Sequence, residues 1–169
     1  MKPARLILIG PPAAGKTTLG RRWAHQAKLP FWDTDEEIVC RTGRSIEEWF
    51  QAGETCFRQV EWDTIVQLLE REERGVIAVG GGFPAQPGAM SLLLKAGYVL
   101  WIDPPIEWLV SRWRQVSIER PPLHHRSEAE RIALMTHRRS FYREADLHWP
   151  IDIIPENLVW KWAERRLRA

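Results

Sequence analysis

The fold is decided by a stretch that reads Gly-Pro-Pro-Ala-Ala-Gly-Lys-Thr at residues 10–17. It directly follows the apolar run Leu-Ile-Leu-Ile at residues 6–9, and an apolar-periodic helical pattern opens after it. A strand that ends in G-x-x-x-x-G-K-[ST] and leads into a helix is a phosphate-binding loop, because its backbone N–H groups and the helix N-terminus converge on an anion. The sequence therefore predicts that the phosphates of a nucleotide bind here.

Two side chains of this phosphate loop are expected to contact the nucleotide phosphates and Mg²⁺. Lys16 should reach the β- and γ-phosphates, and the Thr17 hydroxyl should bind Mg²⁺. Ala13 stands where many such loops carry a third glycine, a replacement free of strain only if the position does not need a positive φ. The alternative is an ordinary strand, turn and helix with an incidental lysine. The residues expected to bind the nucleotide in this loop are Gly10, Ala13, Ala14, Gly15, Lys16, Thr17 and Thr18.

Length and charge favour one domain with a small-molecule partner. The chain has 169 residues, and its 24 basic and 22 acidic residues leave a net charge of +2. This balance gives no large field to attract nucleic acid or a membrane, and no apolar run approaches membrane-spanning length. There is no room for a signal sequence before the first strand, so we expect a cytoplasmic protein. With no long apolar stripe left over, we expect a monomer.

The two cysteines, Cys40 and Cys56, have neither metal-ligand spacing nor the spacing of a redox pair. We therefore expect both to be buried thiols in a reducing compartment.

Apolar strands alternate with helical patterns along the chain, as in a parallel sheet covered by helices on both faces. The predicted strands are 5–9, 29–32, 76–79, 98–102 and 147–153, the last of them interrupted by Pro150. The predicted helices are 16–27, 36–41, a short one capped by Ser45, 55–73, 89–96, one capped by Asp103 and ending at 112 or 113, 128–144 and 155–167.

Two strands are followed by residues suited to a ligand. Asp33 and Asp35 come after the second strand, and Gly80-Gly81-Gly82 follows the third. Ligands of parallel sheets bind beyond the carboxyl ends of the strands, where these residues fall. Asp33 and Asp35 could instead simply cap the next helix, and the glycines could form a loose loop.

A polar segment with poor periodicity, residues 114–126, separates two later helices. A loop of this length in a compact domain is usually functional, and here we expect it to form a lid. Its adjacent His124 and His125 are expected to be exposed lid residues rather than metal ligands, because no acidic or cysteine partner lies at ligand spacing.

Several short motifs occur in a fixed order and spacing. They are 33–38 (DTDEEI), 41–46 (RTGRSI), Gly53-Glu54 with Phe57-Arg58 and Glu61, Gly80-Gly81-Gly82, Arg120-Pro121, and Arg138 four residues before Tyr142. Together they resemble the shikimate kinases over nearly the whole chain. The resemblance implies a P-loop, nucleoside-monophosphate-kinase-like α/β fold: a three-layer sandwich whose five-stranded parallel sheet is flanked by helices on both faces. It also implies one domain, 1–169, with a substrate-binding segment at about 33–61 and a lid at about 112–126.

The resemblance implies transfer of the ATP γ-phosphoryl group to the 3-hydroxyl of shikimate, in aromatic amino-acid biosynthesis. Arg58 and Arg138 would then bind the substrate carboxylate, for which a guanidinium offers a planar fork. Asp35 would bind a hydroxyl and act as the base or orienter of the attacking oxygen. The backbone of Gly80, Gly81 and Gly82 would complete the substrate site.

The nucleotide side of the site follows from the same resemblance. Asp33 would hold Mg²⁺ alongside Thr17, and Arg112 would flank the adenine. Arg120, on the lid, would close over the β- and γ-phosphates and act in catalysis with Lys16. The lid departs from the family pattern, since it reads Arg-Pro-Pro-Leu at 120–123 where the family usually has Arg-Pro-Leu-Leu.

Other interpretations remain open for some of these residues. Arg58 and Glu61 lie at helical spacing and could form a surface ion pair. Arg138 competes with Arg139 and Arg143 for the substrate. The chain could also be a kinase of another small hydroxylated acid or polyol, such as gluconate, or an ATP-binding regulator with impaired catalysis.

Overall fold

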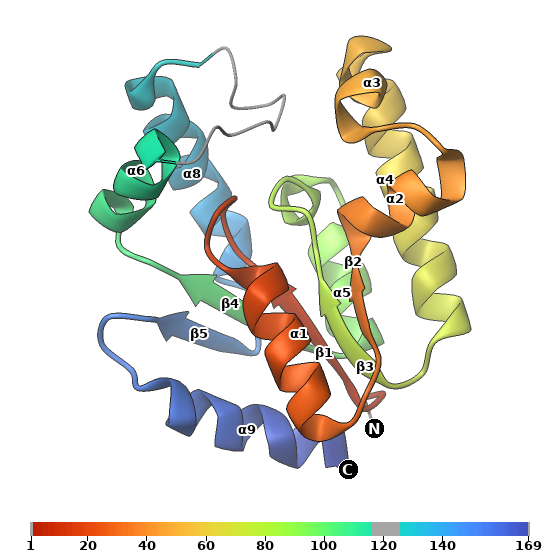
Figure 1. The fold of residues 1–169 in the computed structure, drawn as a ribbon, viewed down its shortest axis with the longest axis vertical. Helices are drawn as coiled ribbons and strands as arrows, with labels where there is room; N and C mark the ends of the chain where they lie inside the picture. Colours follow the sequence, from red (N-terminus) through yellow and green to blue (C-terminus); the bar gives the residue numbers. More distant parts are fainter. Residues whose placement is uncertain (1, 116–125, 169) are drawn as a thin grey trace.

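Five parallel strands form the centre of the molecule. The computed structural model describes residues 2–115 and 126–168. The sheet has the strand order β2-β3-β1-β4-β5 (Figure 1). Its strands are β1 (Arg5–Ile9), β2 (Phe31–Asp33), β3 (Gly75–Ala78), β4 (Tyr98–Asp103) and β5 (Leu147–Pro150). The predicted number and parallel direction of the strands are confirmed.

Helices connect successive strands, as crossover connections between parallel strands require. They are α1 (Lys16–Ala27), α2 (Thr34–Thr42), α3 (Ile46–Gln51), α4 (Glu54–Arg71), the 3₁₀ turn η1 (Phe83–Ala85), α5 (Ala89–Ala96), α6 (Ile106–Gln115), α8 (Glu128–Tyr142) and α9 (Glu156–Arg168). The predicted capping box of Ser45 is present, with the Glu48 N–H donating to the Ser45 hydroxyl.

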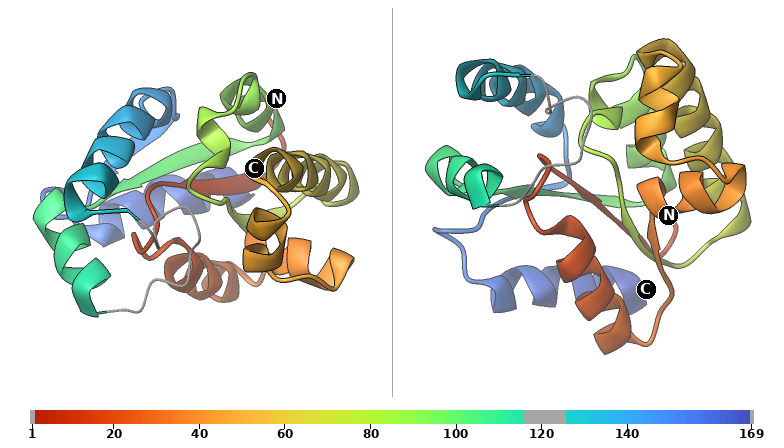
Figure 2. Two further views of the ribbon diagram at one scale, coloured as in Figure 1. Left: turned by 90° about the horizontal axis from the view of Figure 1, so that it is seen from above. Right: turned by 45° about the horizontal axis from the view of Figure 1, so that its top comes forward.

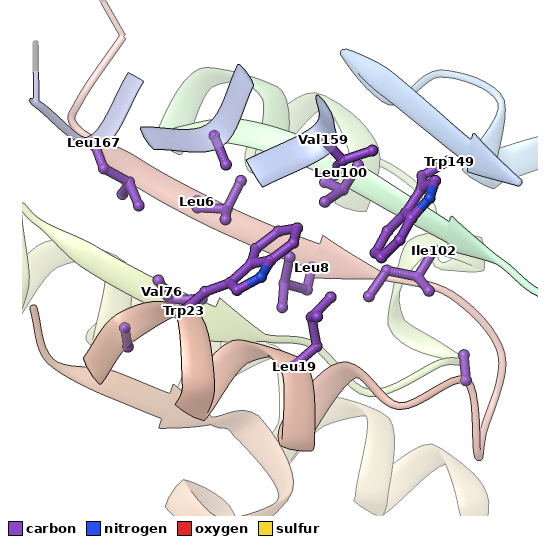
Figure 3. Packing of buried hydrophobic residues seen from close by; sticks show 13 residues of the cluster. Leu6, Leu8, Leu19, Trp23, Val76, Leu100, Ile102, Trp149, Val159 and Leu167 are labelled. Carbon is purple, nitrogen blue, oxygen red and sulfur yellow. The ribbon is translucent and has the colours of Figure 1, made fainter. Parts of the chain in front are cut away.

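A hydrophobic layer fills each side of the sheet, because successive side chains of β1 point to opposite faces. Leu6 and Leu8 pack with α1 and α9 around Trp23, which is fully buried (Figure 3). Ile7 and Ile9 pack on the opposite face with α4, α5 and α8. The predicted sandwich of three layers is therefore confirmed.

Two groups of helices rise above the carboxyl end of the sheet. In both views of Figure 2, α6 and α8 lie on one side of the loop between β1 and α1, and α2, α3 and α4 lie on the other. The phosphate loop thus lies between the predicted substrate-binding segment and the helices that flank the predicted lid.

Several predictions about the fold are wrong. Strand β2 runs over Phe31–Asp33 rather than 29–32. Cys40 and Cys56 are exposed rather than buried, because they lie on outer faces of α2 and α4. Asp103 does not cap α6, since it is the last residue of β4 and its Oδ2 accepts hydrogen bonds from Arg139 and His148. Strand β5 ends at Pro150 rather than at residue 153.

Within residues 2–115 and 126–168, no helix is both long enough and apolar enough to cross a bilayer.

Candidate active site

The phosphate loop has the backbone of an anion-binding turn. Gly10 and Gly15 both have positive φ, at 145° and 92°. Lys16 is buried, and its Nζ donates to the carbonyl oxygens of Gly10 and Pro11, 2.8 Å from each. The lysine side chain therefore folds back over the loop, where its charge faces the space in which phosphates would lie.

Ala13 has a positive φ, so alanine at this position is strained. Its φ is 67°, in the left-handed region where a side chain costs about 1–2 kcal/mol relative to the right-handed one. Its methyl group packs against the hydrophobic cluster of Leu109, Trp113 and Met135 from α6 and α8. The packing offsets part of the strain, so the position accepts alanine.

Asp33 caps helix α2 and also contacts Thr17 of the phosphate loop. Its Oδ1 accepts from the Asp35 N–H at 3.0 Å and caps α2, while its Oδ2 accepts from Thr17 Oγ1 at 2.5 Å. Hydroxyl and carboxylate oxygens are the ligands that Mg²⁺ prefers, so the Thr17–Asp33 pair fits this ion. No cluster of three or more potential metal-binding side chains occurs in the described part of the chain, so further ligands would come from phosphate and water.

A cavity of about 170 Å³ joins the phosphate loop to the end of β2. Its lining includes Lys16, Thr17, Asp33, Asp35 and Arg112. Asp35 therefore shares one space with the residues expected to bind the nucleotide.

Arg112 lies at the edge of that cavity, on α6. Its guanidinium lies over the ring of Trp108, 4.6 Å from the ring centroid. The other predicted lid residue, Arg120, lies outside the described residues, as do His124 and His125.

A charged cluster extends the site beyond Asp35. Arg58 Nη1 donates to Glu61 Oε2 at 2.7 Å, and Arg58 Nη2 lies 3.2 Å from Glu54 Oε1. The Glu61 side chain is 1% exposed and that of Arg58 is 18% exposed. The pair is therefore no surface ion pair, because its carboxylate is buried and its guanidinium is mostly buried.

Burial raises the pKa of Glu61 to about 7, against the opposing charge of Arg58. The negative charge of Asp35 adds to this increase, and the positive charge of Arg138 reduces it. Charged groups of α2, α4 and α8 therefore all act on the Glu61 carboxyl group.

Arg138 reaches the same cluster from α8. It is buried, whereas Arg143 is exposed and Arg139 bonds to Asp103 at 2.6 Å. Burial lowers the pKa of Arg138, on which the charges of Arg58 and Glu61 also act. Of these three arginines, Arg138 is the buried one, and the charge of Arg58 acts on it.

The side chains of Glu61 and Arg58 pack directly against the backbone of the glycine run 80–82. A Cβ added at Gly80 would lie 2.7 Å from Glu61 Oε1, and one added at Gly82 would lie 2.6 Å from Arg58 Nη2. Tyr142 donates its hydroxyl proton to the Gly81 carbonyl at 2.6 Å, and burial raises its pKa, so the hydroxyl stays protonated. The glycines therefore form a fixed turn rather than a loose loop.

Three residues of the cluster were not among the predicted site residues. Glu61 and Tyr142 were quoted only as parts of motifs, although the spacing of Glu61 from Arg58 indicates their pairing. Gln86, whose Nε2 donates to Glu61 Oε2 at 2.7 Å, has no signal in the sequence at all. Its contact depends on how η1 packs against α4.

Comparison with known proteins identifies the family of this chain. The family model for shikimate kinase matches residues 12–153. This chain belongs to the shikimate kinase family. The shikimate kinase of Aquifex aeolicus is 36% identical over 156 residues, which cover 92% of this chain and 91% of that protein.

Solved shikimate kinases have the same fold. The crystal structure from Aquifex aeolicus has a TM-score of 0.80 at 33% identity, covering 97% of this chain and 96% of that one. A shikimate kinase from Acinetobacter baumannii in complex with shikimate has a TM-score of 0.83 at 29% identity, covering 96% of this chain and 90% of that one. The predicted family and the nucleoside-monophosphate-kinase-like fold are confirmed.

Proposed function

We propose that this chain phosphorylates the 3-hydroxyl of shikimate with the γ-phosphoryl group of ATP, giving shikimate 3-phosphate and ADP. The observation that carries the proposal is the position of Asp35, which lines the phosphate-loop cavity and also interacts electrostatically with Glu61, the partner of Arg58. A carboxylate at this junction can contact an acceptor hydroxyl while the phosphoryl donor lies beside it.

The substrate side of the site supports a small hydroxylated acid. Arg58 and Arg138 would bind the single carboxylate of shikimate, since each offers a fork of N–H donors. Asp35 would accept a hydrogen bond from a ring hydroxyl, and the backbone of Gly80, Gly81 and Gly82 would let the ring approach closely. Two cations and one acceptor therefore match one carboxylate and neighbouring hydroxyls.

The catalytic roles follow from charge. Asp35 orients the attacking hydroxyl and takes its proton, as a carboxylate does in other phosphoryl transfers. Lys16 binds the β- and γ-phosphates, and Arg120 would approach them from the lid and disperse the charge of the transition state. Thr17 and Asp33 would hold Mg²⁺, which neutralises phosphate charge when bound, and Arg112 would flank the adenine.

We further propose that one domain carries these functions. Residues of about 33–61 bind the substrate, and residues of about 112–126 close over ATP. The protein would act as a monomer, without nucleic-acid or membrane partners, in agreement with a net charge of +2.

The experiment is ADP release from MgATP by the purified protein, with shikimate present, absent, or replaced by quinate or gluconate. We expect release that depends on shikimate and is lost in Lys16→Ala but kept in Lys28→Ala, which changes an exposed lysine. The proposal would be contradicted if gluconate but not shikimate stimulated ADP release, or if none of the acceptors stimulated it.

Asp35→Asn separates chemistry from binding in the same assay. It removes the base but keeps the size of the side chain, so we expect kcat to fall by roughly 10²-fold or more while ATP still binds. Near-normal turnover would remove Asp35 from its catalytic role.

A further inference from the structure

We propose that Gln86 is a positioning residue for the substrate carboxylate: it fixes the Glu61 carboxylate, which in turn orients the Arg58 guanidinium. The inference rests on the proposed function, because it assumes that Arg58 binds the carboxylate of shikimate. It adds a residue outside the phosphate loop, the paired aspartates and the glycine turn.

The first argument is geometric. Glu61 Oε2 accepts two hydrogen bonds at 2.7 Å, one from Arg58 Nη1 and one from Gln86 Nε2. The two donors come from different elements, α4 and the residue that follows η1. Because the Glu61 side chain is 1% exposed, water has little access to replace a donor that is removed.

The second argument is that the main chain holds Gln86 firmly. Its N–H donates to the Phe83 carbonyl at 2.9 Å, and its carbonyl accepts from the Ala89 N–H at 3.1 Å. Phe83 is fully buried and lies against the ring of Trp62 on α4, with 5.3 Å between the ring centroids. The Gln86 amide is therefore presented to Glu61 by a rigid turn.

The same turn also limits where Arg58 can lie. A Cβ at Gly82 would approach Arg58 Nη2 to 2.6 Å, so the guanidinium packs directly on the backbone of this turn. Residues 82–86 thus contact the guanidinium through Gly82 and its carboxylate partner through Gln86. A shift of the Gln86 side chain would loosen the contact between Arg58 and Glu61, the most buried of the carboxylates that pair with Arg58.

The third argument is electrostatic. The charged groups that act on Glu61 are Arg58 on α4, Asp35 on α2 and Arg138 on α8. Burial and Asp35 favour the neutral acid, whereas the two arginines favour the carboxylate, and these opposed effects leave its pKa at about 7. An N–H donor favours the charged form, so loss of Gln86 would leave more Glu61 protonated at neutral pH. A neutral Glu61 would hold Arg58 less firmly.

The test compares Gln86→Met with the wild type and with Gln67→Met, which makes the same change on an exposed face of α4. The readouts are KM for shikimate, KM for ATP and kcat at pH 7 and pH 9, with thermal unfolding as the check on folding. A hydrogen bond to a charged group is worth about a tenfold change in affinity.

We expect Gln86→Met to raise KM for shikimate about tenfold at pH 7 and clearly less at pH 9, where Glu61 is ionised without its amide partner. KM for ATP and kcat should stay within about twofold of the wild type, as should every constant of Gln67→Met. Should Gln86→Met fail to fold, Gln86→Glu keeps the shape of the side chain and is expected to raise KM for shikimate at least as much.

The proposal is overturned if KM for shikimate of the folded variant stays within about twofold of the wild type at pH 7, or if it rises equally at pH 9. It is also overturned if KM for ATP rises in parallel, because the residue would then only stabilise the fold. Failure of the proposed function is distinguishable, since the wild type would then show no shikimate-dependent turnover.

Discussion

At the scale of single residues, Ala13 has a backbone conformation that is rare for alanine. A left-handed φ of 67° is ordinary for glycine, yet here the residue carries a methyl group that packs against α6 and α8. Trp113 of the same cluster also donates its Nε1–H to the Pro12 carbonyl, at 3.4 Å. The phosphate loop is therefore supported by α6 and α8, the helices on either side of the predicted lid.

Ala13→Gly should change the free energy of unfolding by no more than about 1.5 kcal/mol. Relief of about 1–2 kcal/mol of left-handed strain is offset by the greater entropy of an unfolded glycine, about 0.5–1 kcal/mol, and by loss of a partly buried methyl group, at most about 0.8 kcal/mol. Urea unfolding at pH 7.5 measures the change.

Ala13→Val should instead destabilise the fold by about 2 kcal/mol or more, because a β-branched side chain fits the left-handed region poorly. Ala52→Val, at an exposed position with right-handed φ and ψ, is the matched control. A folded Ala13→Val as stable as that control would show that the loop does not need a left-handed residue here.

The residue scale also shows what a single sequence can predict about a site. The phosphate loop and the two aspartates could be located because each follows a strand in a parallel sheet. The choice of Arg138 over its neighbours rested on resemblance, since helical periodicity does not say which arginine is buried. Gln86 could not be found, because its partner lies 25 positions away along the chain.

At the scale of elements, helix α4 positions the Arg58–Glu61 pair by burying a carboxyl group on its apolar face. Glu61 is buried on this helix together with Phe57, Ile65 and Leu68. A carboxyl group with a raised pKa binds its proton more tightly in the folded protein than in the unfolded one. Its contribution to stability is therefore complete below the unfolded pKa of about 4.3 and is lost as pH rises to about 7.

Glu61→Gln should flatten this pH dependence. Between pH 4.5 and pH 7.5 the free energy of unfolding of the wild type should fall relative to that of the variant, by about 3 kcal/mol, because glutamine has no proton to lose. Urea unfolding of both proteins at several pH values in this range checks it. Parallel curves for the two proteins would mean that Glu61 titrates normally.

The ends of elements were predicted less well than their existence. Helix α2 begins at Thr34 instead of residue 36, because the side chain of Asp33 caps it at once. Asp103 was expected to cap α6, but it instead binds Arg139 of α8 and His148 of β5. A local pattern identified a helix start near Asp103, and a tertiary contact gave its side chain a different partner.

At the scale of the whole molecule, alternation of strands and helices predicts a parallel sheet but not its strand order. The order β2-β3-β1-β4-β5 places β1 in the middle, so the phosphate loop emerges at the centre of the carboxyl edge. The end of β3 lies beside it and the end of β2 lies next to that of β3, which brings Asp33, Asp35 and the glycine turn to the same edge. The site is thus a consequence of topology as much as of the motifs themselves.

The most direct measurement is calorimetric titration of the wild-type protein with shikimate and with its methyl ester, which keeps the ring and hydroxyls but has no negative charge. If Arg58 and Arg138 bind the carboxylate, shikimate should bind at least about tenfold more tightly than the ester, and Arg58→Ala should remove most of this difference. Equal affinity of the wild type for the acid and the ester would contradict the assignment of this cluster as the shikimate site.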